Sequence, residues 1–325
     1  MEELLRVEHL HVGFTVGEQE TVVLRDVSFS IGAGEVLGMI GETGCGKSVT
    51  GNAILRILPG NARTGGNIQY EGQKLLQLSE EELRRLRGRE IAAVPQSPVT
   101  SLDPMMRVGN QVAECVSAGG KTACEEVKES VRSVFERLGL SRRKDCYESY
   151  PWQLSGGMCQ RVLISMGMIS RAKLLVVDEP TKAIDWAVRK EVSEVFRELK
   201  SDLGCAMLLI THDIAMANEL ADRVAVMYCG EIVEIGETKE VLYHCMHPYT
   251  RGLIHAMPSR GFFPMRGFMP PFSELPEGCC FQERCPYQKE ECHQVQEMQK
   301  LENRHSVRCC RAKDLIGSRN HKLSN

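Results

Sequence analysis

The chain has 325 residues, a formal net charge of −3 and a pI near 6.3. This length allows about two domains, and the weakly acidic balance gives no basic field that would indicate a nucleic-acid-binding protein. No apolar run approaches the roughly 18 residues that a membrane-spanning helix needs, so we expect any membrane role to act through a partner. Residues 4–32 alternate apolar and polar side chains around a turn at 17–20, which predicts an antiparallel β layer.

A glycine-rich segment follows the apolar run 36–40, which we interpret as a buried strand. It reads Gly41-Glu42-Thr43-Gly44-Cys45-Gly46-Lys47-Ser48 and fills the pattern G-x-x-x-x-G-K-S/T. The glycines let backbone N–H groups point at phosphate oxygens, and a helix that begins near Gly46 and continues through 49–58 adds its partial positive charge. Lys47 is then expected to reach the β- and γ-phosphates, and the Ser48 hydroxyl to ligate Mg²⁺.

The middle of the chain changes from strands to helices. The segments expected first are a loop at 59–66, a strand at 67–70, a helix at 80–88 and a strand at 91–94. Prolines at positions 95 and 98 disfavour a helix there. From 108 to 140 apolar residues recur at three- and four-residue steps, so we interpret 97–170 as a mainly helical insertion.

Two apolar strands deliver polar side chains at their carboxyl ends, which is where parallel α/β sheets bind ligands. The strand 174–178 ends in Asp178 and Glu179, and the strand 206–210 is followed by His212. Asp178 suits the shell of a Mg²⁺ ion, usually through water, and Glu179 is placed to polarise an attacking water. The alternatives are solvated acids at a strand end and a structural histidine.

The segment Leu154-Ser155-Gly156-Gly157-Met158-Cys159-Gln160-Arg161 opens a helix that should run to about residue 169. Ser155 can cap this helix, and its glycines expose N–H groups to an anion. The remaining elements are expected as a helix at 187–199, strands at 223–228 and 231–235, and a helix at 238–243.

Taken together, these segments resemble the ATPase subunit of an ABC transporter, in the same order over nearly the whole chain. The phosphate loop corresponds to Walker A, residues 174–179 to Walker B and residues 154–160 to the ABC signature. The resemblance implies an α/β P-loop NTPase core with an antiparallel β subdomain, a helical subdomain and a small cysteine-rich C-terminal extension. It also implies that Gln96 is the Q-loop residue at the Mg²⁺, that His212 contacts the γ-phosphate and that Phe14 stacks on adenine.

In the family that this chain resembles, two ATPase domains bind ATP head to tail. The signature would then cover the partner's nucleotide, through residues Leu154, Ser155, Gly156, Gly157 and Gln160. Asp185 would lie in a loop at the dimer interface. The implied partners are a homologous but non-identical ATPase subunit, two transmembrane permease subunits that dock the helical insertion, and an extracellular substrate-binding protein. The chain is expected at the cytoplasmic face of the cell (inner) membrane, as a peripheral subunit that binds ATP and Mg²⁺ and no nucleic acid.

Two places depart from the family pattern. Lys182 and Trp186 flank Asp185 where a small and an aliphatic residue are usual, which indicates tuning toward a particular partner. Cys45 stands where serine is common. Its backbone N–H still serves a phosphate, but we expect the thiol to make the site sensitive to alkylation and ATP to protect it.

The chain after residue 245 resembles the C-terminal extension of dipeptide, oligopeptide and nickel importer ATPases. We therefore expect an ATPase domain at 1–245 and an extension at 246–325. Most of the 14 cysteines should be reduced thiols in a chain of this size, but six of them fall between 279 and 310. Four of these resemble the ligands of a [4Fe–4S] cluster in peptide-transport members, namely Cys279, Cys285, Cys292 and Cys309. Their spacings of six, seven and 17 residues and the Cys285-Pro286 pair favour a cluster over a tetrahedral zinc, with free thiols as a third possibility.

The resemblance predicts the ATP-binding and hydrolysing subunit of an importer of dipeptides or oligopeptides. Nickel or metal-chelate uptake is the alternative within the same class. A soluble ABC protein acting on DNA or the ribosome usually has a second cassette or a long coiled coil, and the sequence shows neither a second P-loop nor a sustained heptad. A regulatory subunit that binds ATP without hydrolysis is disfavoured because Glu179 and His212 are intact.

Overall fold

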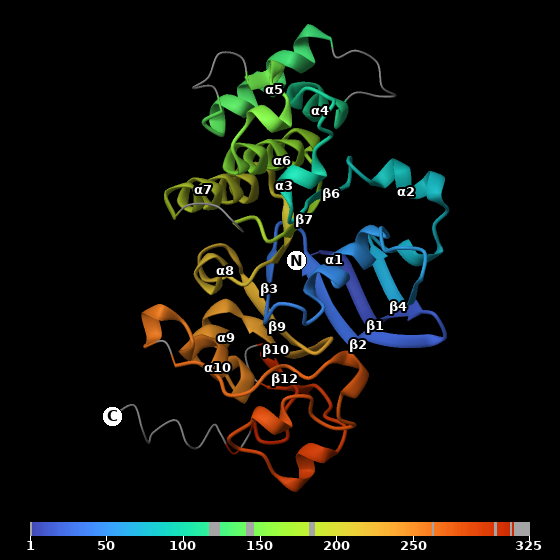
Figure 1. Cartoon of the computed structure of the whole chain (residues 1–325), viewed down its shortest axis with the longest axis vertical. Coiled ribbons are helices and arrows are strands. Elements are labelled where there is room, and N and C mark those ends of the chain that lie inside the picture. The colour runs from blue at the N-terminus through green and yellow to red at the C-terminus, as the bar shows by residue number, and fades with distance from the viewer. Residues whose placement is uncertain are drawn as a thin grey trace. The chain divides into compact units, whose positions relative to one another are not determined.

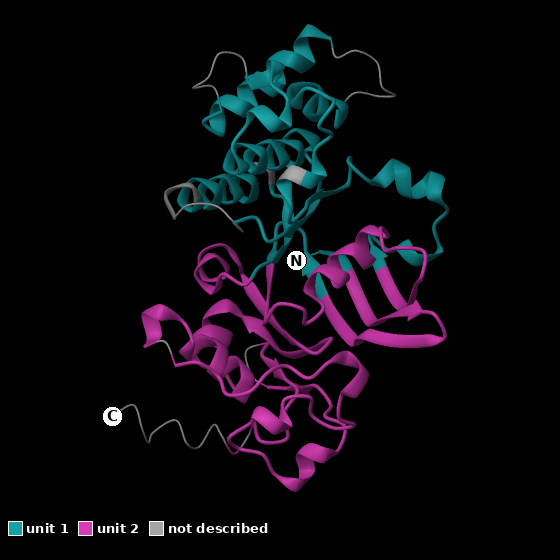
Figure 2. Ribbon diagram, in the orientation of Figure 1, with its two compact units in different colours: residues 1–5, 30–36, 69–211 teal, residues 6–29, 37–68, 212–325 magenta. Residues whose placement is uncertain are grey.

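The computed structural model describes residues 2–116, 124–140, 146–181, 186–261, 263–301, 304–312 and 314, with only the backbone described at 99, 186–188 and 202–203. The chain forms two compact units, coloured teal and magenta in Figure 2. Unit 1 comprises residues 1–5, 30–36 and 69–211, and unit 2 comprises residues 6–29, 37–68 and 212–325. The domain boundary expected at residue 245 stays a prediction.

Unit 1 contains three parallel strands, β6 (Ile91–Val94), β7 (Leu174–Asp178) and β8 (Ala206–Ile210), with β7 in the middle. The register pairs Ile91 with Leu174 and Leu174 with Ala206. Every residue of β8 is buried, as expected for a parallel strand covered on both faces. The parallel arrangement predicted from the apolar runs is confirmed, and it puts the carboxyl ends of these strands at one edge.

Helices make up most of the rest of unit 1 (Figure 1). They are α2 (Glu80–Leu86), α3 (Pro98–Ser101), α4 (Val108–Glu114), α5 (Glu125–Arg137), α6 (Gly156–Ser170) and α7 (Trp186–Leu203), with 3-10 turns at Leu75–Gln77, Cys146–Glu148 and Pro151–Gln153 and a short strand β5 (Gln73–Lys74). The predicted helical insertion therefore agrees with α3–α6. The exception is Pro98, which starts α3 although the prolines were expected to prevent a helix. A proline is tolerated at the first helical position, where its missing N–H would have no partner in the helix.

Unit 2 is built around strands in the order β4-β1-β2-β10-β9-β3. Their bounds are β1 (Glu3–Val16), β2 (Gln19–Gly32), β3 (Val36–Ile40), β4 (Ala62–Tyr70), β9 (Arg223–Tyr228) and β10 (Glu231–Glu237), with β11 (Gln299–Lys300) and β12 (Ser306–Val307) from the C-terminal extension. The two-residue turn between β1 and β2 makes them antiparallel, as predicted. Strand β12 pairs with β10, so the extension contributes to the same sheet.

Strand β4 begins at Ala62, inside the segment 59–66 that was predicted to be a loop. The glycines that indicated a loop have a packing role instead. A Cβ on Gly65 would lie 2.1 Å from the His11 ring, and one on Gly66, whose φ is +93°, would lie 2.3 Å from the carbonyl oxygen of His9. Glycine is required here because β1 and β4 approach closely.

The helices of unit 2 are α1 (Lys47–Leu55), α8 (Ile214–Leu220), α9 (Thr238–Tyr243) and α10 (Pro248–His255), with 3-10 turns at Pro258–Arg260, Phe272–Glu274, Gln282–Arg284 and Glu290–His293. Helix α1 stops three residues before the predicted end at 58, because Arg56 adopts a left-handed conformation with a φ of 51°. None of the described helices has the length and apolar character needed to cross a membrane.

Candidate nucleotide-binding site

The phosphate loop joins β3 to α1 in unit 2, as the sequence predicts. All five residues of β3 are buried, so the strand is a rigid base for the loop. Gly41 has a φ of +156°, and a Cβ there would lie 2.2 Å from the carbonyl oxygen of Met227. Gly46 has a φ of +110°, and its Cβ would lie 2.7 Å from the Leu24 side chain. The loop therefore follows a path that side chains at these two positions would obstruct.

The ammonium group of Lys47 lies over the start of this loop. Its Nζ donates hydrogen bonds of 2.9 Å to the carbonyl oxygens of Gly41 and Glu42. Lys47 is only 5% exposed, whereas Thr43 and Gly44 are exposed and Ser48 is half-buried in the first turn of α1. The positive charge is thus held beside the loop backbone, which is the arrangement that phosphate binding needs.

Cys45 is fully buried within the loop. Burial raises the pKa of its thiol, although the nearby Lys47 acts in the opposite direction. Because the thiolate is the form that reacts, a buried thiol with a raised pKa is poorly reactive. The expectation that Cys45 makes the site sensitive to alkylation stays a prediction, and the burial of the thiol argues against it.

Two residues of the extension hold Glu42, the second residue of the loop. The backbone N–H of Glu42 donates a 2.8 Å hydrogen bond to the hydroxyl of Tyr249 on α10. Both terminal nitrogens of Arg284 donate to the Glu42 carboxylate, each at 3.0 Å. Sequence reasoning missed Tyr249 and Arg284, because no spacing pattern connects residues of the extension to a loop so far away in the chain.

Asp178, expected in the shell of Mg²⁺, and Glu179, expected to polarise the attacking water, lie at the end of β7 in unit 1. Asp178 pairs in register with Ile210, and the backbone N–H of Glu179 donates a 2.8 Å hydrogen bond to the Ile210 carbonyl. Glu179 is 6% exposed and has a φ of 50°. A left-handed conformation at a residue other than glycine costs about 1 kcal/mol, so the strand end holds Glu179 in an intrinsically unfavourable backbone conformation.

The other expected nucleotide residues also lie next to strands. Gln96 follows β6 in unit 1 and is half-buried. His212 follows β8 and is exposed, and Phe14 is a half-buried residue of β1. Asp185 and Lys182 lie outside the described residues.

The signature segment opens α6 in unit 1, as predicted. The Ser155 hydroxyl accepts a 3.3 Å hydrogen bond from the Met158 N–H and caps the helix. Ser155 and Gly156 are exposed, Leu154 and Gly157 are half-buried, and a Cβ on either glycine would meet open space. Gln160 is fully buried, further along the same helix.

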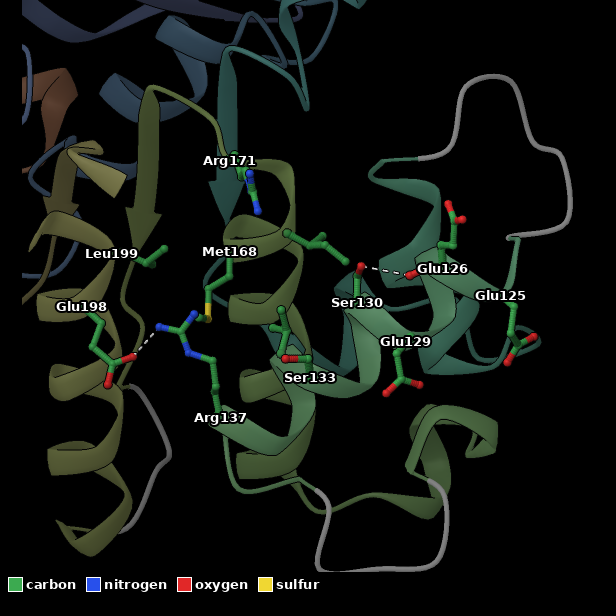
Figure 3. A pocket seen from close by; sticks show the side chains of 12 residues that line it. Glu125, Glu126, Glu129, Ser130, Ser133, Arg137, Met168, Arg171, Glu198 and Leu199 are labelled. Atoms are coloured by element: carbon green, nitrogen blue, oxygen red, sulfur yellow. Dashed lines mark hydrogen bonds and ion pairs between the residues drawn. The ribbon is translucent and has the colours of Figure 1, made fainter. Parts of the chain in front are cut away.

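A separate groove of about 710 Å³ lies among α5, α6 and α7 in unit 1 (Figure 3). Arg137 and Glu198 form a 2.8 Å ion pair across it, and Glu125, Glu126 and Glu129 line its α5 side. None of the residues expected to bind ATP lines this groove. Its carboxylates would repel a triphosphate, so we do not assign it to the nucleotide.

The extension brings its four matching cysteines into one region. The N–H of Cys279 donates a 2.8 Å hydrogen bond to the carbonyl of Cys292. Burial raises the pKa of Cys279 to about 12, with smaller contributions from Cys309 and Cys292, and burial likewise raises the pKa of Cys309 to about 12, with contributions from Cys285 and Cys292. Within the described residues, however, no group of three or more His, Cys, Asp or Glu side chains is arranged to hold a single metal ion.

Comparisons with known proteins agree with this geometry. Residues 24–182 match the family model of the ABC transporter, and residues 233–292 match that of the oligopeptide/dipeptide transporter C-terminal region. The chain is 38% identical over 260 residues to the dipeptide transport ATP-binding protein DppD of Bacillus subtilis (strain 168), covering 79% of this chain and 78% of the relative. It is 39% identical over 256 residues to the oligopeptide transport ATP-binding protein OppD of Escherichia coli (strain K12), covering 78% and 76%.

Solved structures of ATP-binding cassettes share the fold. One is the dimeric post-hydrolysis structure of the ATP-binding cassette MJ0796 bound to ADP and Pi, with a TM-score of 0.65 and 22% sequence identity. The match covers 72% of this chain and 99% of the MJ0796 chain. Another is the structure of cbiO1 from Clostridium perfringens, part of the ABC transporter complex cbiONQ, with a TM-score of 0.62 and 26% sequence identity. The match covers 75% of this chain and 92% of the cbiO1 chain.

The fold and the phosphate loop define an ATPase cassette of the P-loop class. The chain belongs to the ABC transporter family, and within it to the ATP-binding proteins that carry the oligopeptide/dipeptide transporter C-terminal region. It is accordingly an ATP hydrolase that uses ATP and Mg²⁺. Membership of this family implies membrane permease subunits and a second ATPase subunit as partners.

Proposed function

We propose that this chain powers the uptake of dipeptides or oligopeptides across the cytoplasmic membrane, working at its cytoplasmic face. The observation that carries the proposal is the combination of the cassette with the peptide-transporter C-terminal region in one chain. Relatives that share this combination over most of their length are named for dipeptide or oligopeptide transport. Nickel or metal-chelate uptake stays the untested alternative within the same class.

The phosphate loop is proposed to bind the triphosphate. Its curled backbone supplies N–H groups, Lys47 supplies positive charge at the β- and γ-phosphates, and Ser48 supplies a hydroxyl ligand to Mg²⁺. The burial of Lys47 beside the loop carbonyls supports this role. Phe14 is proposed to stack on adenine, since an aromatic face on β1 offers a surface to a base.

Hydrolysis is proposed to depend on the ends of β6, β7 and β8. Asp178 and Gln96 would complete the Mg²⁺ shell, Glu179 would orient and polarise the attacking water, and His212 would contact the γ-phosphate. The buried carboxylate of Glu179 on a strained strand end supports its role, because such strain is concentrated at functional sites.

A second ATPase subunit is proposed to complete the site. The exposed start of α6, with Ser155 and Gly156, would present N–H groups to the nucleotide bound by the partner. The related cassette MJ0796, whose fold this chain shares, is described as a dimer bound to ADP and Pi. We further propose that the partner is non-identical and that an extracellular binding protein delivers the peptide.

The extension is proposed to hold a [4Fe–4S] cluster through Cys279, Cys285, Cys292 and Cys309. A donor set of thiols alone suits such a cluster. The raised pKa of Cys279 includes contributions from Cys309 and Cys292, and that of Cys309 includes contributions from Cys285 and Cys292. When bound, the cluster would tie together a segment with little apolar core of its own. Iron analysis of anaerobically purified protein should give about four Fe per chain. Stoichiometric zinc without absorbance near 400 nm would contradict the proposal.

The test of the transport function is a complex of this chain with its permease and partner ATPase subunits in proteoliposomes. We expect ATP hydrolysis to be stimulated by a binding protein loaded with peptide, and labelled peptide to accumulate only with ATP. Lys47→Ala should abolish ATP binding by this subunit, because the ammonium group at the phosphates is lost. Hydrolysis that responds to a nickel chelate and not to peptides would contradict the proposed substrate.

A further inference from the structure

Glu42, the second residue of the phosphate loop, is held from two directions by the extension. Its carboxylate side chain is 26% exposed and receives two parallel hydrogen bonds from Arg284, whose side chain is 7% exposed. Such bidentate pairs between a guanidinium and a carboxylate are strong and fix orientation as well as distance. The phosphate loop is thus attached to a residue that directly precedes Cys285.

Arg284 is itself held in place on the extension. Its Nε donates a 3.1 Å hydrogen bond to the carbonyl of Arg266, and one terminal nitrogen also donates to the Tyr228 hydroxyl at 3.2 Å. The guanidinium lies 5.7 Å from the ring centroid of Tyr228 and 5.6 Å from that of Phe281. Removing Glu42 or Arg284 alone would leave the other charge partly buried without its partner, which is costly.

Tyr249 provides the second attachment. It is fully buried near the start of α10, where its N–H donates a 3.0 Å hydrogen bond to the Nδ1 atom of His247. Its ring centroid lies 4.5 Å from that of Tyr228 and 5.4 Å from that of Phe281. The hydroxyl that accepts the Glu42 N–H therefore belongs to a packed aromatic group and has little freedom to move.

The position of Glu42 affects the part of the loop that meets phosphate. Its carbonyl oxygen accepts the 2.9 Å hydrogen bond from Lys47 and a 3.3 Å hydrogen bond from the N–H of Cys45. A displacement of Glu42 would therefore move the carbonyl oxygen to which both Lys47 and the N–H of Cys45 are hydrogen-bonded. The N–H that Tyr249 engages is the one at the beginning of the loop, and it belongs to the same residue whose carbonyl holds Lys47.

We infer that Arg284 and Tyr249 are positioning residues for ATP binding. By holding Glu42, they preorganise the phosphate loop and Lys47, so that nucleotide affinity depends on the docked extension. Preorganisation raises affinity because less ordering remains to be done when the ligand binds. By thermodynamic linkage, bound nucleotide should in turn strengthen the docking of the extension. This inference rests on the proposed function of the loop as the ATP site.

A double-mutant cycle on the full chain tests this inference. Arg284→Met, Glu42→Gln and the double variant are compared with wild type for ATP affinity and for melting temperature. We expect each single variant to weaken ATP binding about tenfold and the double variant to be no weaker, because both changes remove the same contact. The matched control is Arg260→Met, which changes an arginine of the extension whose contact is the Tyr243 ring. It should bind ATP like wild type.

A purely structural ion pair would give a different result. The cycle would then show coupling in melting temperature and none in ATP affinity, which would overturn the inference. If Arg284→Met fails to fold, Arg284→Lys and Tyr249→Phe remain informative, since each keeps most of the packing. We expect these two variants to bind ATP about threefold more weakly. Unchanged affinity in both would also overturn the inference, whereas wild-type protein that binds no ATP would contradict the proposed function itself.

Discussion

Arg284 donates two hydrogen bonds of 3.0 Å to the carboxylate of Glu42, a residue 242 positions earlier in the chain. This ion pair joins the cysteine-rich extension directly to the phosphate loop within unit 2. Strand β12 adds a second connection, because it pairs with β10 of the same unit. The extension is thus an integral part of the unit that contains Walker A.

Because of the path of the phosphate loop, we expect Gly41→Ala to lower the stability of the protein strongly. Its Cβ would lie 2.2 Å from the carbonyl oxygen of Met227, at a φ of +156° that alanine rarely adopts. We expect the free energy of unfolding to fall by about 3 kcal/mol, measured by chemical denaturation. Gly60→Ala is the matched control, because no atom lies within 4 Å of the Cβ that it would add. Equal stability of the two variants would contradict the described loop.

Cys45 should resist alkylation whether or not ATP is present. It is buried with a raised thiol pKa, whereas Cys124 is exposed. Mass spectrometry after a short maleimide pulse should find Cys124 modified at least about a hundredfold faster. Because the pKa of Cys45 is raised, its labelling should increase only at a pH above the ordinary range for a thiol. Rapid labelling of Cys45 that ATP prevents would contradict this prediction and would support the sensitivity expected from the sequence.

Burial of His247 should make the stability of the protein depend on pH. Full burial lowers the pKa of His247 to about 4, against a smaller opposing effect of the Glu234 carboxylate. The unfolded chain takes up a proton on this residue near pH 6.5, and the folded chain does so only near 4. The free energy of unfolding should therefore decrease as the pH falls through this window, by at most about 3 kcal/mol. His247→Asn keeps a side chain that can cap α10 and should flatten the dependence; an unchanged slope would contradict the assignment.

Glu234 should be important for docking the extension. This fully buried carboxylate accepts hydrogen bonds from the N–H groups of Met246 and His247, at 2.7 and 3.0 Å, and lies 2.7 Å from Nε2 of His305. Glu234→Ala leaves these groups buried without their partner, so we expect a loss of about 3 kcal/mol in the free energy of unfolding. Glu237→Ala, at the exposed end of the same strand, should change it by less than about 0.5 kcal/mol. Similar losses in both would show that the buried carboxylate has no special role.

Local patterns predicted much of this molecule. The phosphate loop is specified by eight consecutive residues and an apolar strand before them, so its strand–loop–helix structure follows from sequence alone. The buried strands β7 and β8 and the cap of α6 by Ser155 are local in the same sense. Each of these predictions is confirmed because the residues that determine the structure are neighbours in the chain.

The features that were not predicted from the sequence depend on tertiary contacts. Two glycines in β4 were interpreted as a loop, because the close approach of β1 that requires them is not visible in the sequence. The contacts of Tyr249 and Arg284 with Glu42 likewise exist only once α10 and the extension have packed against β9. Burial of Cys45 was missed for the same reason, since the sequence alone does not show what surrounds the thiol.

The most direct test of the central claim is ATP hydrolysis by the complex of this chain with its permease and partner ATPase subunits, comparing wild type with Glu179→Gln. The amide keeps the shape of the buried side chain and removes the carboxylate proposed to polarise water. We predict that hydrolysis falls at least about a hundredfold while ATP binding is retained. Unchanged turnover would contradict the account, since hydrolysis would then occur at the partner's site and this chain would only bind ATP.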